Sequence, residues 1–282
     1  MGLGGYLAWT ATAREIIKRT GNNTKILPVE SHGNFIKVVD SEIFRHNDDF
    51  CLDFKSASSK GIFLLPMVLN NPAANYCKKD TPQKAFHRQD KHIIEQYCEV
   101  YGIENPVLQC YLSTDKDCWT DRQVLESTGT DRYVVIEPNS KVNYTPNRAY
   151  PFEKWQKIVN SLKEQITFVQ VGVSGSKVLD NVVDLTGKTT FRDTAKVIKL
   201  ASVFVSAEGG LVHAATAVGT KSIVIITGYQ SEKMVAYPQN INVNISSHEV
   251  CGLKVSCDHC RLDAENHNHE NITEILRKEL CL

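Results

Sequence analysis

The chain has 282 residues with 32 basic and 32 acidic side chains, so its formal net charge is zero. This length accommodates one large or two ordinary α/β domains with a sizeable core. The balanced charge, without a basic run, argues against nucleic acid as the main partner and against an electrostatic membrane anchor. No apolar run approaches the roughly 18 residues of a membrane span, so we expect none.

The cysteine count points to a reducing compartment. There are nine cysteines, an odd number, and the early charges of the chain do not form the pattern of a signal peptide. Arg14, Lys18 and Arg19 come late and fall within a helical pattern. We therefore expect free thiols and a cytoplasmic location.

The first half of the chain predicts a short α/β domain. It opens on the glycine-rich segment Gly2-Leu-Gly-Gly5, which leads into a helix that ends before Gly21. Such a turn normally follows a strand, and no residues remain here to form one. We therefore expect an N-terminal domain that is short or lacks its first strand. The predicted helices are 6–19, 83–101 and 115–127, and the predicted strands are 25–29, 61–66 and 107–112.

The second half alternates regularly between strands and helices. The polar stretch 126–132 is the best linker candidate, which gives domains of 1–128 and 129–282. The predicted strands are 133–137, 166–172, 182–185, 202–206, 222–227 and 241–245, and the predicted helices are 151–163, 191–200, 211–218 and 272–280. The last helix is a candidate for packing back on the N-terminal domain.

The segment 202–227 predicts a ligand site. It reads as a buried strand, the turn Gly209-Gly210, a short helix and a second buried strand. In an open α/β sheet such a turn lies at the carboxyl edge, where ligands bind. Glycines let a ligand approach the backbone, and the helix start offers free N–H groups and a positive dipole end. The segment is therefore typical of a phosphate or pyrophosphate site, although glycines that serve packing alone are the alternative.

Several motifs follow one another at regular places in the second half. They are Glu137-Pro-Asn-Ser140 with Arg148, Tyr150-Pro151 and Trp155 after it, Val169-Gln-Val-Gly172, Leu185-Thr-Gly-Lys-Thr189, Glu208-Gly-Gly-Leu-Val-His213-Ala-Ala, and Ala217-Val-Gly-Thr220. In this order they resemble the donor-binding domain of glycosyltransferase family 9, the heptosyltransferases. Gly2-Leu-Gly-Gly5 and Arg14 resemble the first loop and helix of that family. The resemblance is good from about residue 130 onward and patchy before it.

This resemblance implies a fold class and an activity. The expected fold is α/β with two Rossmann-like domains that face each other across a cleft, the GT-B arrangement. The expected activity is inverting transfer of a sugar from a nucleotide donor, with ADP-heptose as a candidate, and without a metal for the chemistry. The acceptor would be a glycan, a lipid-linked molecule or a protein, in the assembly of surface polysaccharide such as lipopolysaccharide or of glycoprotein.

The resemblance also implies site residues. It places Glu208, Gly209 and Gly210 against the diphosphate and sugar of the donor. Arg148 takes the position of the family's phosphate-binding lysine, with a solvated loop charge as the alternative. Further donor-side residues are Ser140, Gly172 and His213. The histidine either steadies the glycine turn or touches a phosphate, or it is an ordinary core histidine.

Gly5 departs from the family pattern. The family has an aspartate there, which acts as general base on the acceptor hydroxyl, and glycine has no group to accept a proton. Glu30 is the only replacement that the sequence offers, and a surface carboxylate is the alternative for it. A non-catalytic sugar-nucleotide-binding or scaffold protein is therefore the second hypothesis. A nicotinamide-dependent dehydrogenase is disfavoured, because no strand precedes the glycine segment.

Three cysteines near the end of the chain suggest a metal. Cys251, Cys257 and Cys260 include a C-x2-C half-site that suits tetrahedral zinc or iron. Other nitrogen and sulfur ligands lie nearby in sequence, namely His259, His267, His269 and Cys281. The sequence shows no clear second half-site, so thiols without a metal are the alternative to a structural ion.

Overall fold

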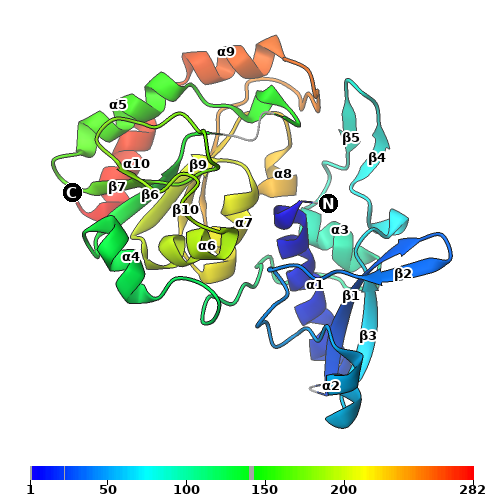
Figure 1. The fold of residues 1–282 in the computed structure, drawn as a ribbon. Helices are drawn as coiled ribbons and strands as arrows, with labels where there is room; N and C mark the ends of the chain where they lie inside the picture. The colour runs from blue at the N-terminus through cyan, green and yellow to red at the C-terminus, as the bar shows by residue number, and fades with distance from the viewer. Residues whose placement is uncertain (1, 22, 140–142) are drawn as a thin grey trace.

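The computed structural model describes residues 2–21, 23–139 and 143–282, so the predicted site residue Ser140 lies outside the described residues. The structure is mixed α/β, with a three-stranded sheet, a six-stranded sheet and a two-stranded hairpin (Figure 1). We call residues 2–102 the N-terminal unit and residues 121–282 the C-terminal unit. None of the described helices combines the length and apolar character needed to cross a bilayer.

The N-terminal unit is built on the sheet order β2-β1-β3. Strand β1 pairs with β3 in parallel and with β2 in antiparallel fashion. The elements are α1 (Leu3–Thr20), β1 (Thr24–His32), β2 (Phe35–Val38), α2 (Phe54–Ser59), β3 (Phe63–Val68), η1 (Pro72–Ala74), β4 (Cys77–Asp80), β5 (Ala85–His87) and α3 (Ile93–Glu99). Helix α1 begins at Leu3, so Gly4 and Gly5 lie in its first turn and not in a turn before it.

The predicted helix 83–101 is wrong in its first half. The hairpin of β4 and β5 occupies that region and extends upward from the N-terminal unit in Figure 1. The C-terminal unit contributes to holding the hairpin in place, because the N–H of Ala85 donates to the carbonyl of Gly252 over 2.9 Å. The helix itself starts only after His92, where a capping box with Glu95 satisfies the first free N–H groups.

The C-terminal unit is a parallel sheet with the strand order β11-β10-β9-β6-β7-β8. The order of the strands reverses between β6 and β9, because β7 and β8 follow β6 toward one edge of the sheet, whereas β10 and β11 follow β9 toward the other. Doubly wound dinucleotide folds have the same reversal. The strands are β6 (Tyr133–Glu137), β7 (Thr167–Gln170), β8 (Val183–Asp184), β9 (Val203–Ala207), β10 (Ser222–Ile226) and β11 (Ile241–Asn244). These six agree with the predicted strands to within a few residues.

Helices cover both faces of this sheet (Figure 1). Alternate residues of β6 show the division, since Val134 and Ile136 face the core under α5 and α10, whereas Val135 faces the core shared with α6 and α7. The helices are α4 (Asp121–Thr128), η2 (Pro146–Arg148), α5 (Phe152–Leu162), α6 (Phe191–Leu200), α7 (Gly210–Val218), α8 (Glu232–Val235), α9 (Asp258–Asn266) and α10 (Glu270–Leu280). Contrary to expectation, the last helix packs on α5 and not on the N-terminal unit.

The passage between the units falls earlier than the polar stretch 126–132. Residues 103–120 contain neither helix nor strand, so the predicted strand 107–112 is absent and the predicted helix 115–127 starts only at Asp121. The chain already lies on the C-terminal unit at this point, because α4 packs on α6 and Arg192 donates to the carbonyls of Ser113 and Lys116.

One hydrophobic core runs through both units. It contains Leu7 and Trp9 of α1, Ile94 of α3, and Leu211 and Val212 of α7. Helix α1 lies beside α7 (Figure 1), and these two helices make the main helix contact between the units. The two units are therefore joined by packed side chains as well as by the chain.

Candidate functional site

The candidate site lies where the sheet order reverses, at the carboxyl ends of β6 and β9. Glu137, the last residue of β6, is in register with Ser206 of β9. Glu208 follows β9 directly, and the chain after β6 leads to Arg148 at the end of η2. Ligands of open α/β sheets bind in the crevice outside this reversal. The fold therefore brings Arg148 and Glu208, which lie 60 positions apart, to the place where a ligand is expected.

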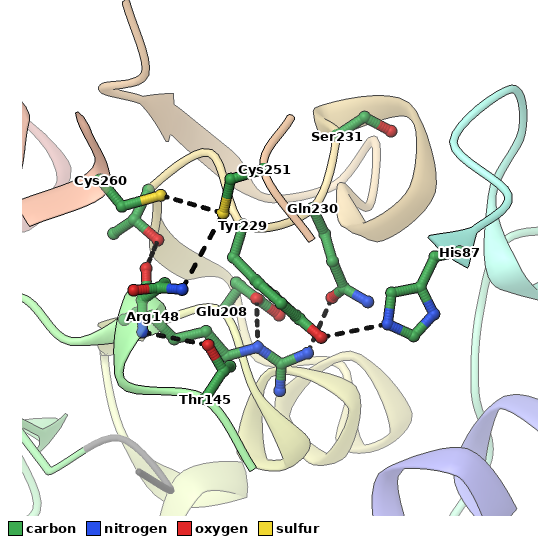
Figure 2. Close-up of polar contacts among 12 residues, drawn as sticks. His87, Thr145, Arg148, Glu208, Tyr229, Gln230, Ser231, Cys251 and Cys260 are labelled. Atoms are coloured by element: carbon green, nitrogen blue, oxygen red, sulfur yellow. Dashed lines mark hydrogen bonds and ion pairs between the residues drawn. The ribbon is translucent and has the colours of Figure 1, made fainter. Parts of the chain in front are cut away.

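Arg148 and Glu208 form an ion pair of 2.6 Å between Nε and Oε1. The Glu208 side chain is 7% exposed and that of Arg148 is 19% exposed. The other end of the guanidinium donates from Nη2 to Oε1 of Gln230 over 2.9 Å, and its carbon lies 4.8 Å from the centre of the Tyr229 ring. These contacts fix the orientation of the guanidinium plane (Figure 2). Arg148 is thus a held group and not a solvated loop charge.

Desolvation raises the pKa values of the two carboxyl groups at this edge, those of Glu137 and Glu208. The pKa of Glu208 is raised by desolvation, and the neighbouring Arg148 guanidinium offsets part of this rise. Desolvation alone raises the pKa of Glu137 to about 8. Glu137 belongs to a motif in the sequence but was given no role there. With its pKa at about 8, Glu137 adds little negative charge to this edge at pH 7.

Two helix starts meet beside this ion pair. Gly209 is the N-cap of α7 and Gly210 its first residue. Gly4, in the first turn of α1, approaches so closely that a Cβ atom on it would lie 3.1 Å from Cα of Gly210 and 2.9 Å from Cδ2 of His213. Each helix start carries free N–H groups and about half a positive charge. Together they favour an anion at this point.

His213 has the contacts of a structural histidine. Its Nδ1 lies 2.5 Å from the hydroxyl of Tyr237, which also bonds to Sγ of Cys110 over 3.2 Å. The ring of His92, from α3, packs edge-on against Tyr237. Desolvation, with a smaller contribution from Arg148, lowers the pKa of His213 to about 4. His213 therefore links α7 to the N-terminal unit as a neutral ring.

Gly172 lies at the end of β7, away from the contacts just described. A Cβ atom on it would lie 3.2 Å from Oγ of Ser176 and 3.6 Å from Cγ2 of Thr186. Its carbonyl accepts from the N–H of Gly187 over 2.9 Å. Among the described residues, its near neighbours thus belong to the turns that follow β7 and β8.

The Glu30 side chain lies beside the start of α1. Its Oε1 accepts a hydrogen bond of 3.1 Å from the hydroxyl of Tyr6, the residue that follows Gly5. Its second oxygen lies 3.5 Å from Nε2 of His32. Glu30 is therefore tied to the first turn of α1, which contains Gly5.

The three predicted metal-binding cysteines come together. The sulfur atoms of Cys251, Cys257 and Cys260 all lie within 4.8 Å of one another, and Cys251 and Cys260 are 3.4 Å apart. The hydrogen bond from Cys260 lowers the pKa of the Cys251 thiol to about 6. Three thiols at such spacing fit the base of a tetrahedral zinc or iron site. We call these three residues the thiol cluster.

The other predicted metal ligands have separate partners. His267 Nδ1 lies 2.9 Å from the hydroxyl of Tyr150, and His269 pairs with Glu270. The His259 ring packs against that of His248, and Cys281 is exposed near the last residue of the chain.

Four residues of the site were not found from the sequence. They are His87, Asn147, Tyr229 and Gln230. His87 Nε2 lies 3.1 Å from the hydroxyl of Tyr229, and this contact joins the β4–β5 hairpin to the C-terminal unit (Figure 2). Desolvation lowers the pKa of His87 to about 4. The partners lie 142 positions apart in the chain, and no local pattern marks such a pair.

Comparison with known proteins adds a family match. The model of glycosyltransferase family 9 (heptosyltransferase) matches residues 74–262, more than half of the chain. No curated protein matches the sequence.

Solved structures of similar fold include the following three. One is a family 9 glycosyl transferase from Veillonella parvula, with a TM-score of 0.65, 11% identity, and coverage of 100% of this chain and 95% of that chain. Another is ADP-heptose LPS heptosyltransferase II of E. coli, with a TM-score of 0.52, 13% identity, and coverage of 68% and 62%. The third is the dodecameric iron-containing heptosyltransferase TibC in complex with ADP-D-beta-D-heptose, with a TM-score of 0.52, 13% identity, and coverage of 77% and 59%.

These likenesses concern the fold, and they confirm the predicted α/β architecture of GT-B type. The chain spans about three fifths of the lengths of heptosyltransferase II and TibC, and almost the whole of the Veillonella chain.

Proposed function

Because this chain belongs to glycosyltransferase family 9, we propose that it transfers a heptose-like sugar from a nucleoside diphosphate donor to an acceptor hydroxyl, with inversion at the anomeric carbon. The observation that carries this proposal is the placement of the Arg148 guanidinium beside the start of α7, where the strand order of the sheet reverses. The guanidinium and the helix start at that edge would offer positive groups to a bound diphosphate, which would share Arg148 with Glu208.

The proposed chemistry concentrates on the leaving group. As the bond between sugar and diphosphate breaks, negative charge grows on the phosphate oxygens. Arg148 and the N–H groups at Gly209 and Gly210 would stabilise that charge, because they are already oriented and need little rearrangement. A guanidinium and a helix start supply what a divalent cation supplies elsewhere, so we propose transfer without a catalytic metal. Glu208 would face the sugar hydroxyls once the diphosphate shares Arg148.

Glu30 is the proposed general base. The base must come within hydrogen-bond reach of the acceptor hydroxyl, on the face of the sugar opposite the diphosphate. Gly5 supplies no such group, whereas the Glu30 carboxylate is held beside the same helix turn by Tyr6. A Glu30→Gln variant should bind donor normally and lose turnover by a factor of about 100 or more. Equal loss of donor binding would exclude this role.

The donor and acceptor are proposed by class. TibC was solved with ADP-D-beta-D-heptose, so ADP-heptose is the first donor to test. The acceptor would be a glycan, a lipid-linked molecule or a protein, as in lipopolysaccharide or glycoprotein assembly. All nine cysteines are free thiols, which supports a reducing, cytoplasmic location.

A structural metal is proposed at the thiol cluster. TibC is described as iron-containing, and the close approach of three sulfur atoms here suits zinc or iron. Cys251, Cys257 and Cys260 would be the protein ligands. The ion would cross-link the loop 251–257 to α9 and supply no step of sugar transfer.

The second hypothesis is a protein that binds a sugar nucleotide without turning it over. The resemblance supports it, because it would align Gly5, which has no side chain, with the expected position of the family's base. Donor binding without product, across a panel of glycan, lipid-linked and protein acceptors, would support this hypothesis over the transferase.

The deciding experiment is a thermal-shift screen against nucleoside diphosphates and their sugars. One nucleotide should raise the unfolding temperature, by an amount corresponding to about 2.7 kcal/mol at a hundredfold excess over Kd. Arg148→Ala should abolish the shift, whereas Lys221→Ala, which removes an exposed lysine paired with Glu279, should retain it. If no nucleotide shifts the wild type, the transferase proposal fails.

A further inference from the structure

A single buried asparagine is surrounded by the loop that carries two of the three thiols. Asn147, 6% exposed, donates from Nδ2 to the carbonyls of Leu253 and Val255 over 2.7 and 2.9 Å. Its Oδ1 accepts from the N–H of Cys257 over 2.9 Å. Cys251 Sγ lies 3.9 Å from the same Nδ2. The loop 251–257, which we call the thiol loop, thus satisfies the whole amide group.

Asn147 is also the residue immediately before Arg148. Both belong to η2, whose N-cap Thr145 bonds to the thiol loop through the carbonyl of Leu253 over 2.7 Å. The carbonyl of Asn147 accepts from the hydroxyl of Thr227 over 2.6 Å. The backbone that carries the guanidinium is therefore held on one side by the thiol loop and on the other by the end of β10.

The thiol loop reaches two further parts of the site. Cys251 N donates to the carbonyl of Gly228, and Gly252 N donates to that of Tyr229, the ring beneath the guanidinium. The same loop pairs with the β4–β5 hairpin through Ala85 and through Lys254, whose N–H donates to the carbonyl of Gln83. The loop therefore lies between the donor-side arginine and the hairpin of the N-terminal unit.

We infer that Asn147 is a positioning residue that couples the state of the thiol cluster to the donor site. When the three sulfur atoms are drawn onto one metal ion, the thiol loop closes around the Asn147 amide and fixes the backbone of Arg148 and the segment 227–230. When the cluster is open, the loop releases both. This inference rests on the proposed function for its consequence, a tighter hold on the donor diphosphate.

The coupling requires the amide group itself. Two donated bonds and one accepted bond join Asn147 to three different peptide groups of the loop, and the burial of the side chain keeps water from replacing them. Alanine removes all three while leaving the three cysteines in place. Removal of a group that hydrogen-bonds around a metal ligand commonly lowers metal affinity or activity by about 10- to 100-fold.

The first test uses the full chain with Zn²⁺ as the probe of the cluster. In the wild type, saturating Zn²⁺ should slow hydrogen exchange in residues 145–149 and 227–231 by about tenfold or more, because an ion that binds only the closed loop stabilises it against local opening. In Asn147→Ala, Zn²⁺ should still bind, as measured by metal analysis, but should leave exchange in both segments unchanged. Asn240→Ala is the matched control, because it removes a side chain–backbone bond to Ser222 at another place in the same unit, and it should respond like the wild type.

Two results would overturn the inference. One is equal Zn²⁺ protection of both segments in Asn147→Ala and in the wild type. The other is the absence of Zn²⁺ binding. If the wild type binds no Zn²⁺, there is no metal site for Asn147 to couple to. If only Asn147→Ala fails to bind it, the asparagine is needed to form the metal site itself. None of these readings involves a nucleotide, so they stand even if the transferase proposal fails.

The second test measures the consequence at the donor site with ADP as the probe. Removal of Zn²⁺ should raise the Kd of the wild type for ADP by about tenfold, a typical coupling between two sites. Asn147→Ala should show the raised Kd with or without Zn²⁺, and Asn240→Ala should behave as the wild type. Independent, additive effects of Zn²⁺ removal and of Asn147→Ala would contradict the coupling. Failure of the wild type to bind any nucleoside diphosphate would count against the proposed function alone.

Discussion

At the scale of single residues, the candidate donor site is a small set of charges that compensate one another. Glu208 is buried, and its charge is matched by the Arg148 guanidinium 2.6 Å away. A diphosphate that shares the guanidinium leaves Glu208 with less compensation, so ligand binding and the protonation of Glu208 are coupled. In the proposed transferase, a bound diphosphate would therefore compete with Glu208 for the guanidinium of Arg148.

The contact between Gly4 and Gly210 gives a sharp prediction. Alanine at position 4 would place Cβ 3.1 Å from a backbone carbon of α7 and 2.9 Å from the His213 ring. Gly4→Ala should lower the free energy of unfolding by about 1–3 kcal/mol through overpacking, although alanine is the better helix former by about 1 kcal/mol. Chemical denaturation measures this. Gly2→Ala, which meets nothing within 4 Å, should not destabilise, and equal losses in the two variants would contradict the close contact.

Glu137 should make the stability of the fold fall as the pH rises, which is opposite in sign to the effect of a buried histidine with a lowered pKa. Its folded pKa, about 8, lies above the ordinary value of 4.5. Between these values the folded state binds more protons than the unfolded state, so this group removes stability as the pH rises. Glu137→Gln should therefore gain unfolding temperature relative to the wild type from pH 5 to pH 8. Glu164→Gln, at an exposed position, should run parallel to the wild type, and a parallel profile for Glu137→Gln would refute the shift.

At the scale of elements, helix α3 depends on a titratable cap. His92 Nδ1 accepts from the N–H of Ile94, and burial lowers the pKa of His92 to about 3. Because the unfolded histidine takes up a proton near pH 6.5, the stability from this group is present above that pH and is lost as the pH falls toward 3. His92→Asn keeps a capping acceptor that does not titrate. Its unfolding temperature should decline less steeply than that of the wild type from pH 6.5 to pH 4, and identical slopes would disprove the assignment.

The elements of the C-terminal unit could be predicted because their signals are local. Strand β6 and helix α6 match the predicted ranges 133–137 and 191–200 in full. Continuous apolar runs mark buried parallel strands, and the glycine turn before α7 marks the ligand edge of the sheet. The family resemblance rested on the same segments, so fold class and family were both accessible from residues 130 onward.

The remaining elements depend on partners far away in the chain. Strands β4 and β5 are four and three residues long and largely polar, and they persist because the thiol loop pairs with Lys84 and Ala85. The same is true in the site, where the hydrogen-bond partners of the Asn147 amide are loop residues more than 100 positions later in the chain. Sequence periodicity contains no information on such contacts.

At the scale of the whole molecule, the thiol cluster predicts stabilisation by metal. Zn²⁺ or Fe²⁺ should raise the unfolding temperature of the wild type, since an ion that binds only the folded state adds about 2.7 kcal/mol at a hundredfold excess over Kd. Cys257→Ser and Cys260→Ser should abolish this effect. Cys281→Ser, at an exposed position, should leave it intact. An unfolding temperature that no metal changes would count against the proposed site.

The core that runs from α1 into α7 has a consequence for how the two units can move. Pulling them apart would expose the buried apolar side chains of the shared core. Small sliding steps of one helix along the other keep those side chains covered, and glycine at positions 4 and 210 leaves the contact surface smooth. Shear of this kind would change the spacing between the two units by little. If the proposed acceptor binds between the units, the size that fits is set largely by the architecture before any ligand arrives.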